Sequence, residues 1–246
     1  MRKVMLTLFA LFTISFLTSC SSDDDSNNAS VVLLKKAIDT YEDDSTYTTE
    51  YEYSGNKIIR SYDSEGEYVL FTYTGNLITK LEFFLSDDTL EQVETYSYDS
   101  SDRLISFVRV FPTDTDWGNR ETYSYNANGT VTANYYSGDY DSQTNLDDTA
   151  TITISNNSVT QISYTSGRTL TYTYDSKKNP MINVLGLDKL IFTDGEGGSA
   201  TNNVLTVVDS EGWLSSTGTL QYNSQDFPTL GISTEDGEVI ATAFIY

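Results

Sequence analysis

Apolar and polar positions alternate along most of the chain. From residue 31 onward, aromatic or aliphatic side chains recur at every second position with Thr, Ser or Glu between them, as in Tyr51-Glu52-Tyr53. A period of two places the rings on one face of a strand and the polar groups on the other. The pattern predicts half-buried β-strands, and 13% aromatic residues, with 19 Tyr, suit such surfaces.

The strands recur as a unit of two apolar residues at i and i+2, a turn cluster and a short apolar strand. Turns such as Gly55-Asn56 and Asn128-Gly129 supply the positive φ that tight hairpins need. Most copies start about 20 to 29 residues apart, which leaves room for two strands. The copies start at Tyr51, Phe71, Tyr96, Tyr123, Ile152, Tyr172 and Leu220. We therefore predict one all-β domain over residues 31–246, an antiparallel meander of about 14–17 short strands that is barrel-like or a curled open sheet.

Irregular stretches interrupt this period and are candidate binding loops. They cover residues 112–119, 137–148, 179–187 and 194–203. A helix over Val31 to Ile38 is the alternative to a first strand there, and the β-branched start favours the strand. The ending Phe244-Ile245-Tyr246 is interpreted as a closing strand.

The N-terminus has the features of a secretory signal. Arg2 and Lys3 precede an apolar run that is too short to span a bilayer as a helix, so residues 1–19 are predicted to be a signal peptide. Leu17-Thr18-Ser19-Cys20 resembles the lipobox of bacterial lipoproteins, in which the Cys is lipidated and becomes the first residue of the mature chain. Cys20 is the only Cys in the chain. Residues 20–30 are polar and are predicted to be an acidic tether.

Two resemblances concern the chain as a whole. The recurring Tyr-x-Tyr, turn and Leu-Ile pattern resembles the YD or RHS-type repeats of bacterial surface proteins. The mature chain with its lipobox is similar to a family of uncharacterised Bacteroidota lipoproteins that are described as having a porin-like β fold. The acidic run after Cys20 also resembles their surface-export signal, which implies lipid anchoring to the outer membrane and exposure at the cell surface, with a periplasm-facing protein as the alternative. The resemblance implies an architecture and no catalytic residues.

Charge and strand length limit the partners. The net charge of −22 argues against nucleic acid and against anionic lipid surfaces, because both need a basic footprint, so the expected membrane contact is the lipid at Cys20. Membrane strands need about 9 to 11 residues with a continuous apolar band. Glu52, Asp63 and Glu67 interrupt any such band, so we expect a barrel or sheet that is soluble rather than membrane-spanning.

The residue inventory excludes several kinds of active site. The sequence has no His, and its one Cys is assigned to the anchor, so His-dependent triads and zinc or haem sites with His ligands are ruled out. Carboxylate pairs suffice for glycoside hydrolysis. With 36 acidic residues some pair is inevitable, so the abundance of carboxylates is not evidence for this activity. Ser54-Gly55-Asn56-Lys57 is explained by its hairpin turn. We expect a protein that is not an enzyme, with a carboxylate-based glycosidase as a third hypothesis.

The candidate ligand-binding residues are aromatic side chains near carboxylates in the irregular stretches. Aromatic faces stack on sugar rings, and neighbouring carboxylates accept hydrogen bonds from sugar hydroxyls. They also anchor protein interfaces. The candidates are Trp117, Asp114, Asp116, Tyr136 and Tyr140, with Trp213 a weaker one, and calcium ligands at Asp139 and Asp141. The sequence thus predicts binding of carbohydrate or protein at the cell envelope, with a structural part of an envelope or secretion assembly as the alternative. No cofactor is expected.

Overall fold

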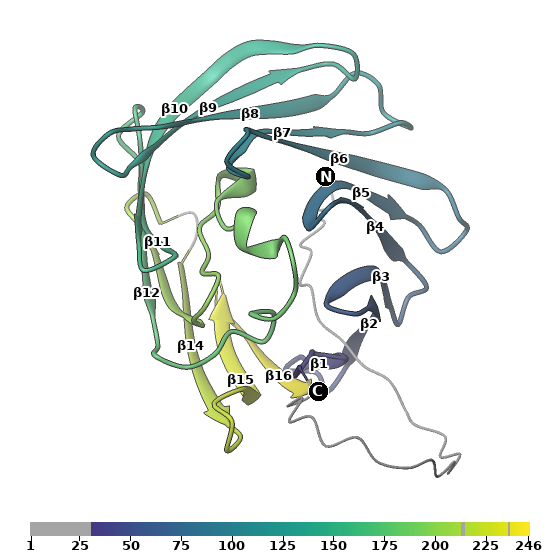
Figure 1. Cartoon of the computed structure of the whole chain (residues 1–246). Coiled ribbons are helices and arrows are strands. Elements are labelled where there is room, and N and C mark those ends of the chain that lie inside the picture. The colour runs from purple at the N-terminus through teal and green to yellow at the C-terminus, as the bar shows by residue number, and fades with distance from the viewer. Residues whose placement is uncertain (1–30, 213–214, 236) are drawn as a thin grey trace, which may run out of the picture.

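The computed structural model describes residues 31–212, 215–235 and 237–246, and its main element is a closed barrel of antiparallel strands (Figure 1). The predicted signal peptide, Cys20, the tether and Trp213 lie outside these residues. The strands are β1 (Lys36–Thr40), β2 (Thr46–Ser54), β3 (Lys57–Asp63), β4 (Tyr68–Thr74), β5 (Leu77–Phe84), β6 (Leu90–Tyr98), β7 (Leu104–Val110), β8 (Gly118–Tyr125), β9 (Val131–Gly138), β10 (Gln143–Ser155), β11 (Ser158–Tyr164), β12 (Thr169–Tyr174), β13 (Val204–Asp209), β14 (Ser215–Tyr222), β15 (Pro228–Glu235) and β16 (Glu238–Ile245).

Each strand pairs with its neighbours in the sequence, and β1 closes the ring by pairing with β16 through Lys36 opposite Ile245 and Ala37 opposite Phe244. The predicted strand number and the barrel-like alternative are confirmed, and the curled open sheet is wrong. The helix considered for Val31 to Ile38 is also wrong, since β1 begins at Lys36 and residues 31–35 form no regular element. No helix in the described part of the chain has the length and apolar character to cross a membrane.

The two faces of the barrel wall differ in chemistry. Inward positions carry the buried core, for example Tyr51, Phe107 and Ile162. The outward positions between them are rich in threonine, which suits a pleated surface in contact with water. These outward threonines include Thr48, Thr72, Thr95, Thr122, Thr132, Thr151, Thr171, Thr173, Thr206, Thr217 and Thr219.

The barrel has two ends, which we name by where the chain begins. At the entry end the chain enters β1 at Lys36, and the connections there are residues 55–56, 75–76, 99–103, 126–130, 156–157, 175–203 and 223–227. At the far end the described connections are residues 41–45, 64–67, 85–89, 111–117, 139–142, 165–168 and 210–212.

The Tyr-x-Tyr repeat has a structural cause at the entry end. The hairpins β4–β5, β6–β7 and β10–β11 each contain a register shift of the β-bulge type next to the second residue of the repeat. The carbonyl just before each bulged position accepts a hydrogen bond from a Tyr hydroxyl on the next strand of the barrel. The donors Tyr98, Tyr125 and Tyr174 reach the carbonyls of Ile78 (2.6 Å), Leu104 (3.0 Å) and Val159 (2.6 Å). In these three cases, a repeat satisfies the bulge of the repeat before it.

The connection 175–203 lies inside the ring of strands and is drawn in green in Figure 1; we call it the inner segment. It contains two short 3₁₀ turns, η1 (Leu187–Lys189) and η2 (Thr193–Gly195), and it buries Val184 and Phe192 in the core. Its backbone bonds to several parts of the wall, including Leu185 N–H to the carbonyl of Asn56 (3.0 Å). The irregular stretches 179–187 and 194–203 are thus parts of one segment that fills the lumen.

Candidate functional site

Two far-end loops lie side by side because β8 and β9 pair along their whole length. The loops are residues 111–117, before β8, and 139–142, after β9. The pairing ends in a glycine pair, Gly118 opposite Gly138. A Cβ on Gly138 would lie 1.9 Å from the carbonyl oxygen of Ser142, so only glycine lets the second loop fold back this closely. The predicted loop at 112–119 is confirmed, whereas most of 137–148 belongs to β9 and β10.

Hydrogen bonds fix the second loop against the first. The buried Gln143 donates through Nε2 to the carbonyls of Asp139 (2.6 Å) and Tyr140 (3.1 Å). The backbone N–H of Tyr140 donates to the carbonyl of Thr115 (3.0 Å). The loops are therefore held in one relative position, and Gln143, which sequence reasoning missed, is the residue that supports them.

Both loops present aromatic side chains to solvent. Trp117 is 47% exposed and packs at a ring-centroid distance of 5.0 Å on Phe111, which supports its indole from one side. Tyr140 on the second loop is 38% exposed. The structure thus brings together two of the predicted ligand-binding aromatics, which can offer flat apolar faces to a sugar ring or to an apolar side chain of a protein.

Carboxylates surround these aromatics. Asp114 and Asp116 lie exposed in the first loop, and Asp139 and Asp141 lie exposed in the second. The Oδ1 atom of Asp139 already accepts from the backbone N–H groups of Asp141 (3.0 Å) and Ser142 (2.8 Å), which stabilises the turn. In the part of the chain that the structure describes, no three side chains of the Asp, Glu, His or Cys type gather as a metal site would require.

Tyr136 lies apart from this group. It occupies an outward position on β9, and the guanidinium of Arg120 lies 4.5 Å from the centre of its ring. Its ring is therefore covered by a neighbour on the outer wall. Of the five residues predicted for ligand binding, the structure gathers Trp117, Asp114, Asp116 and Tyr140 at one place and leaves Tyr136 out.

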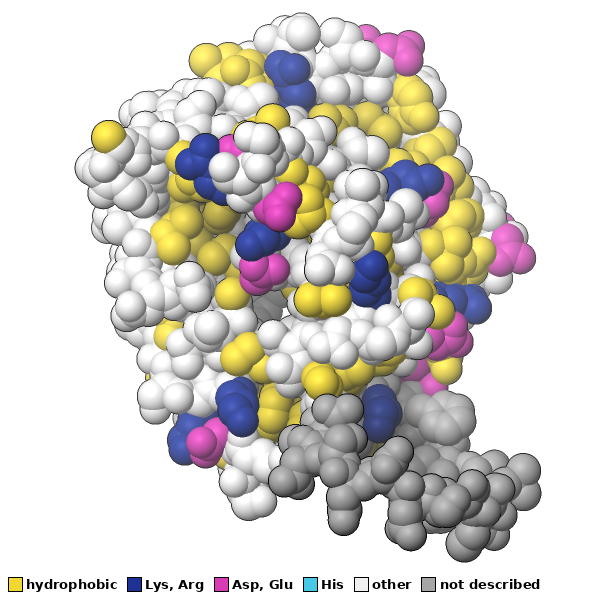
Figure 2. Space-filling view, in the orientation of Figure 1, with side chains coloured by type: hydrophobic (Ala, Val, Ile, Leu, Met, Phe, Trp, Pro, Cys, Tyr) yellow, Lys and Arg dark blue, Asp and Glu magenta, His cyan; other side chains and the backbone are white. Residues whose placement is uncertain are grey.

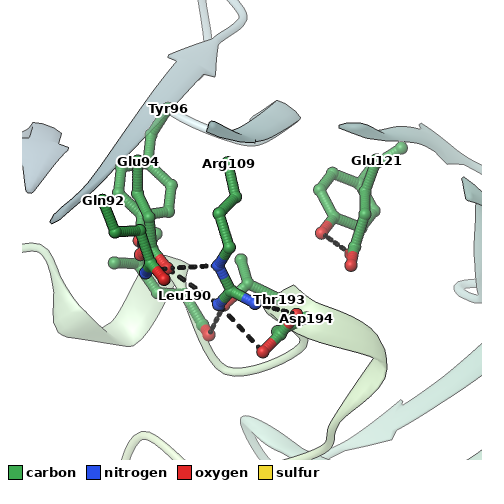
Figure 3. Close-up of polar contacts among 9 residues, drawn as sticks. Gln92, Glu94, Tyr96, Arg109, Glu121, Leu190, Thr193 and Asp194 are labelled. Atoms are coloured by element: carbon green, nitrogen blue, oxygen red, sulfur yellow. Dashed lines mark hydrogen bonds and ion pairs between the residues drawn. The ribbon is translucent and has the colours of Figure 1, made fainter. Parts of the chain in front are cut away.

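A second polar cluster lies inside the barrel, where Arg109 on β7 is held between two carboxylates (Figure 3). Its guanidinium lies 2.8 Å from Glu94 on β6 and 2.8 Å from Asp194 on the inner segment, and its Nη1 and Nη2 both donate to the Asp194 carboxylate. Burial lowers the pKa of Arg109, but the two carboxylates outweigh burial and raise it. The cluster fastens the inner segment to the wall.

Glu121 on β8 lies next to this cluster and is only 2% exposed. Burial raises its pKa to about 8, although the hydrogen bond from the Tyr123 hydroxyl lowers it. Glu94 is similarly enclosed at 5% exposed and accepts from the hydroxyl of Tyr96. Both carboxyls are therefore buried, and that of Glu94 is paired with Arg109.

The sequence did contain a signal for this cluster. Glu94-Thr95-Tyr96-Ser97-Tyr98 recurs as Glu121-Thr122-Tyr123-Ser124-Tyr125, with each Glu in phase with the buried tyrosines. A charged residue at an inward position indicates a partner inside the barrel. Arg109 is the partner of Glu94. Asp194, the other carboxylate that binds Arg109, could not be predicted, because it comes from a connection distant in sequence.

A half-open cavity of about 440 Å³ lies at the entry end between η1 and the connection 99–103. Leu104 and Phe192 line it from the core side, and Arg103 and Asp188 line it with polar groups. Arg103 is paired with Asp99 at 2.7 Å, and Asp188 with Lys189 at 2.7 Å. The cavity therefore combines apolar and polar lining with balanced charge.

Comparison with known proteins gives structural neighbours only. No protein family and no curated protein matches the sequence. A porin-like protein from Bacteroides vulgatus is similar over 87% of this chain and 98% of its own, with a TM-score of 0.49 and 11% identity. Another from Bacteroides uniformis is similar over 82% of this chain and 77% of its own, with a TM-score of 0.37 and 12% identity. Both have the porin-like description that the sequence resemblance implied; the barrel assignment itself rests on the strand pairing.

Proposed function

We propose that this chain is a lipid-anchored envelope protein whose filled barrel is a rigid scaffold, and that it binds a carbohydrate through the two loops at its far end. A protein ligand at the same loops is the alternative within this proposal. The lipid is placed on Cys20, at the outer membrane with the barrel facing the cell exterior.

One observation carries the binding role: Trp117 and Tyr140 are exposed on loops that hydrogen bonds hold together, with four carboxylates around them. Exposed aromatic side chains on a preformed support cost little entropy when a ligand orders them. Carboxylates next to aromatic faces suit a polyhydroxylated ligand, because sugar hydroxyls donate to the carboxylates while the ring stacks.

The residues of the outer wall and of the lumen favour a scaffold that lies outside the hydrocarbon layer of the membrane. A strand facing lipid needs an apolar outward band, whereas here threonines and charged residues such as Glu52 and Arg120 take those positions. A pore needs an open lumen, whereas the inner segment crosses this one and is bonded to its wall.

We also propose that the protein is not an enzyme. The sequence has no His. The inward carboxyls of Glu94 and Glu121 are buried behind tyrosines and the inner segment, which leaves no room for a glycan chain and an attacking water between them.

The test is glycan-array binding by residues 21–246, with calcium and again with EDTA. Trp117→Ala is expected to lower affinity by about fivefold to 150-fold, because a stacked ring contributes roughly 1–3 kcal/mol. Arg103→Ala, which alters the entry-end cavity, is the matched control and should leave binding unchanged.

Binding that survives in Trp117→Ala and disappears in Arg103→Ala would move the site to the cavity. Absence of glycan binding under both conditions would contradict the carbohydrate proposal, and capture of an envelope protein that depends on Trp117 would then identify the protein alternative. Dependence on calcium would assign metal binding to the Asp139 and Asp141 loop.

A further inference from the structure

The charge of the barrel is divided unequally between its two ends. The described far-end connections contain one basic residue, Arg168, among many acidic ones. The acidic residues there are Glu42, Asp43, Asp44, Glu65, Glu67, Asp87, Asp88, Asp114, Asp116, Asp139, Asp141 and Glu211. The far end is therefore strongly acidic, as the net charge of −22 leads one to expect, whereas the entry end is not.

Lysines gather at the entry end on one arc of the rim. The backbone N–H of Lys35 donates to the carbonyl of Ile245 (2.9 Å), and Lys36 pairs with the same residue. Tyr246 follows and packs on Phe227 at 5.1 Å, and the ammonium of Lys178 lies 4.9 Å from the centre of the Phe227 ring. We call this arc the lysine rim; it consists of Lys35, Lys36, Lys177 and Lys178 with the exposed apolar side chains of Val31 and Ile245.

Three carboxylates lie on this arc beside the four lysines: Asp226 is ion-paired, and Asp175 and Glu50 accept hydrogen bonds from uncharged donors. Asp226 is paired with Lys177 at 2.6 Å. Asp175 accepts from Asn203 (2.9 Å) and from the hydroxyl of Tyr222. Glu50, opposite Lys36 in the sheet, accepts from the hydroxyl of Tyr62 (2.7 Å). Lys35 and Lys178 are exposed, so their ammonium groups are available to an external anion.

We propose that the lysine rim docks on the anionic phospholipid surface of the membrane to which Cys20 is attached, so that the far-end loops point away from it. The proposal rests on the lipid anchor proposed above. Lysines beside aliphatic and aromatic side chains are the composition with which proteins contact the interface of an anionic membrane. The acidic far end is repelled by the same surface.

The length and attachment of the tether fit this orientation. A fully extended chain from Cys20 to Lys36 reaches at most roughly 55 Å, and it joins the barrel at the rim itself. The tether is therefore long enough, and attached at the right end, for the lysine rim to reach the lipid. Under this proposal the lysine rim is a local exception to the expectation, from the net charge, that anionic lipid is disfavoured.

The experiment uses the single Cys to separate docking from natural lipidation. Residues 20–246 are coupled through Cys20 to maleimide lipids in vesicles, either of phosphatidylcholine alone or with phosphatidylglycerol, and amide hydrogen exchange is measured by mass spectrometry. Anionic vesicles should slow exchange about two- to fivefold at residues 31–40 and 223–227, and leave residues 41–45, 85–89 and 111–117 unchanged. The protection should decline as salt is raised.

Charge reversal provides the comparison. A Lys35→Glu, Lys36→Glu, Lys178→Glu triple variant should lose the protection, whereas Lys80→Glu, on the outer wall of β5, should keep it. Protection at the far-end turns, or equal exchange on both kinds of vesicle for the wild-type chain, would overturn the proposal. Because the anchor is chemical, this result does not depend on whether cells acylate Cys20, which mass spectrometry of the protein from membranes determines separately.

Discussion

At the second position of the repeat, tyrosine donates a hydrogen bond that phenylalanine cannot make. The hydroxyls of Tyr98, Tyr125 and Tyr174 satisfy carbonyls that the neighbouring bulges leave out of the ladder. A buried carbonyl without a partner costs stability. The first position of the repeat is more variable: Phe71 stands there in one copy, whereas Tyr96 and Tyr123 donate from that position to Glu94 and Glu121.

Tyr98→Phe tests this role. The substitution leaves the carbonyl of Ile78 without its donor inside the wall, so the free energy of unfolding should fall by about 1–3 kcal/mol in urea titration. Tyr68→Phe is the control, because its hydroxyl bonds to Asp88 at an exposed site and water replaces it, with a change below about 0.5 kcal/mol. Equal losses in both variants would contradict the assignment.

Glu121 should make the barrel less stable as the pH rises. Burial raises its pKa to about 8 from the ordinary value of 4.5, so the folded chain holds a proton there that the unfolded chain releases. Its contribution is complete below pH 4.5 and is lost as the pH rises through 8. Glu121→Gln should therefore be more stable than the wild type at pH 8.5, by about 1–3 kcal/mol, and should not be more stable at pH 4.5. Parallel pH profiles of unfolding for the two proteins would show that Glu121 is not responsible.

At the scale of elements, the inner segment is what distinguishes this barrel from an empty one. Phe192 packs edge-on against Tyr123 at 5.0 Å, and Asp194 holds Arg109. These contacts join a connection without long helices or strands to β7 and β8 on the opposite part of the ring. The wall and the segment should therefore unfold together.

Phe192→Ala should lower the free energy of unfolding by about 3–5 kcal/mol, because it opens a cavity between the segment and the wall. Phe84→Ala removes the same side chain from an outward position, where it stacks on Tyr68, and should cost about 1 kcal/mol or less. A loss for Phe192→Ala no larger than for Phe84→Ala would mean that the segment lies loosely in the lumen.

The elements also show how far the sequence could predict this molecule. The period of two and the turn residues predicted the strands and their approximate number, since both signals are local. The same signals missed the inner segment, because residues 179–187 and 194–203 read as two surface loops, and nothing local indicates that Asp194 meets Arg109. The sequence predicted Trp117 and Tyr140 as separate candidates. It did not predict that they lie close together, because their proximity depends on the β8–β9 pairing.

At the scale of the whole molecule, the two ends are unlike. The entry end combines the tether attachment, the lysine rim and the cavity, whereas the far end combines exposed aromatics with an acidic surface. The view in Figure 2 shows acidic and basic side chains next to one another at several places, with polar uncharged groups covering most of that face. The charge asymmetry is between the two ends of the barrel, as the residues of the end connections show.

The behaviour of residues 21–246 without detergent tests the central claim, a filled barrel with a polar wall, most directly. We expect the protein to stay dispersed and to give a β-type circular dichroism spectrum in salt buffer, and to produce no conductance when added to planar lipid bilayers. A protein that folds only after detergent or lipid is added, and then conducts ions, would contradict the account.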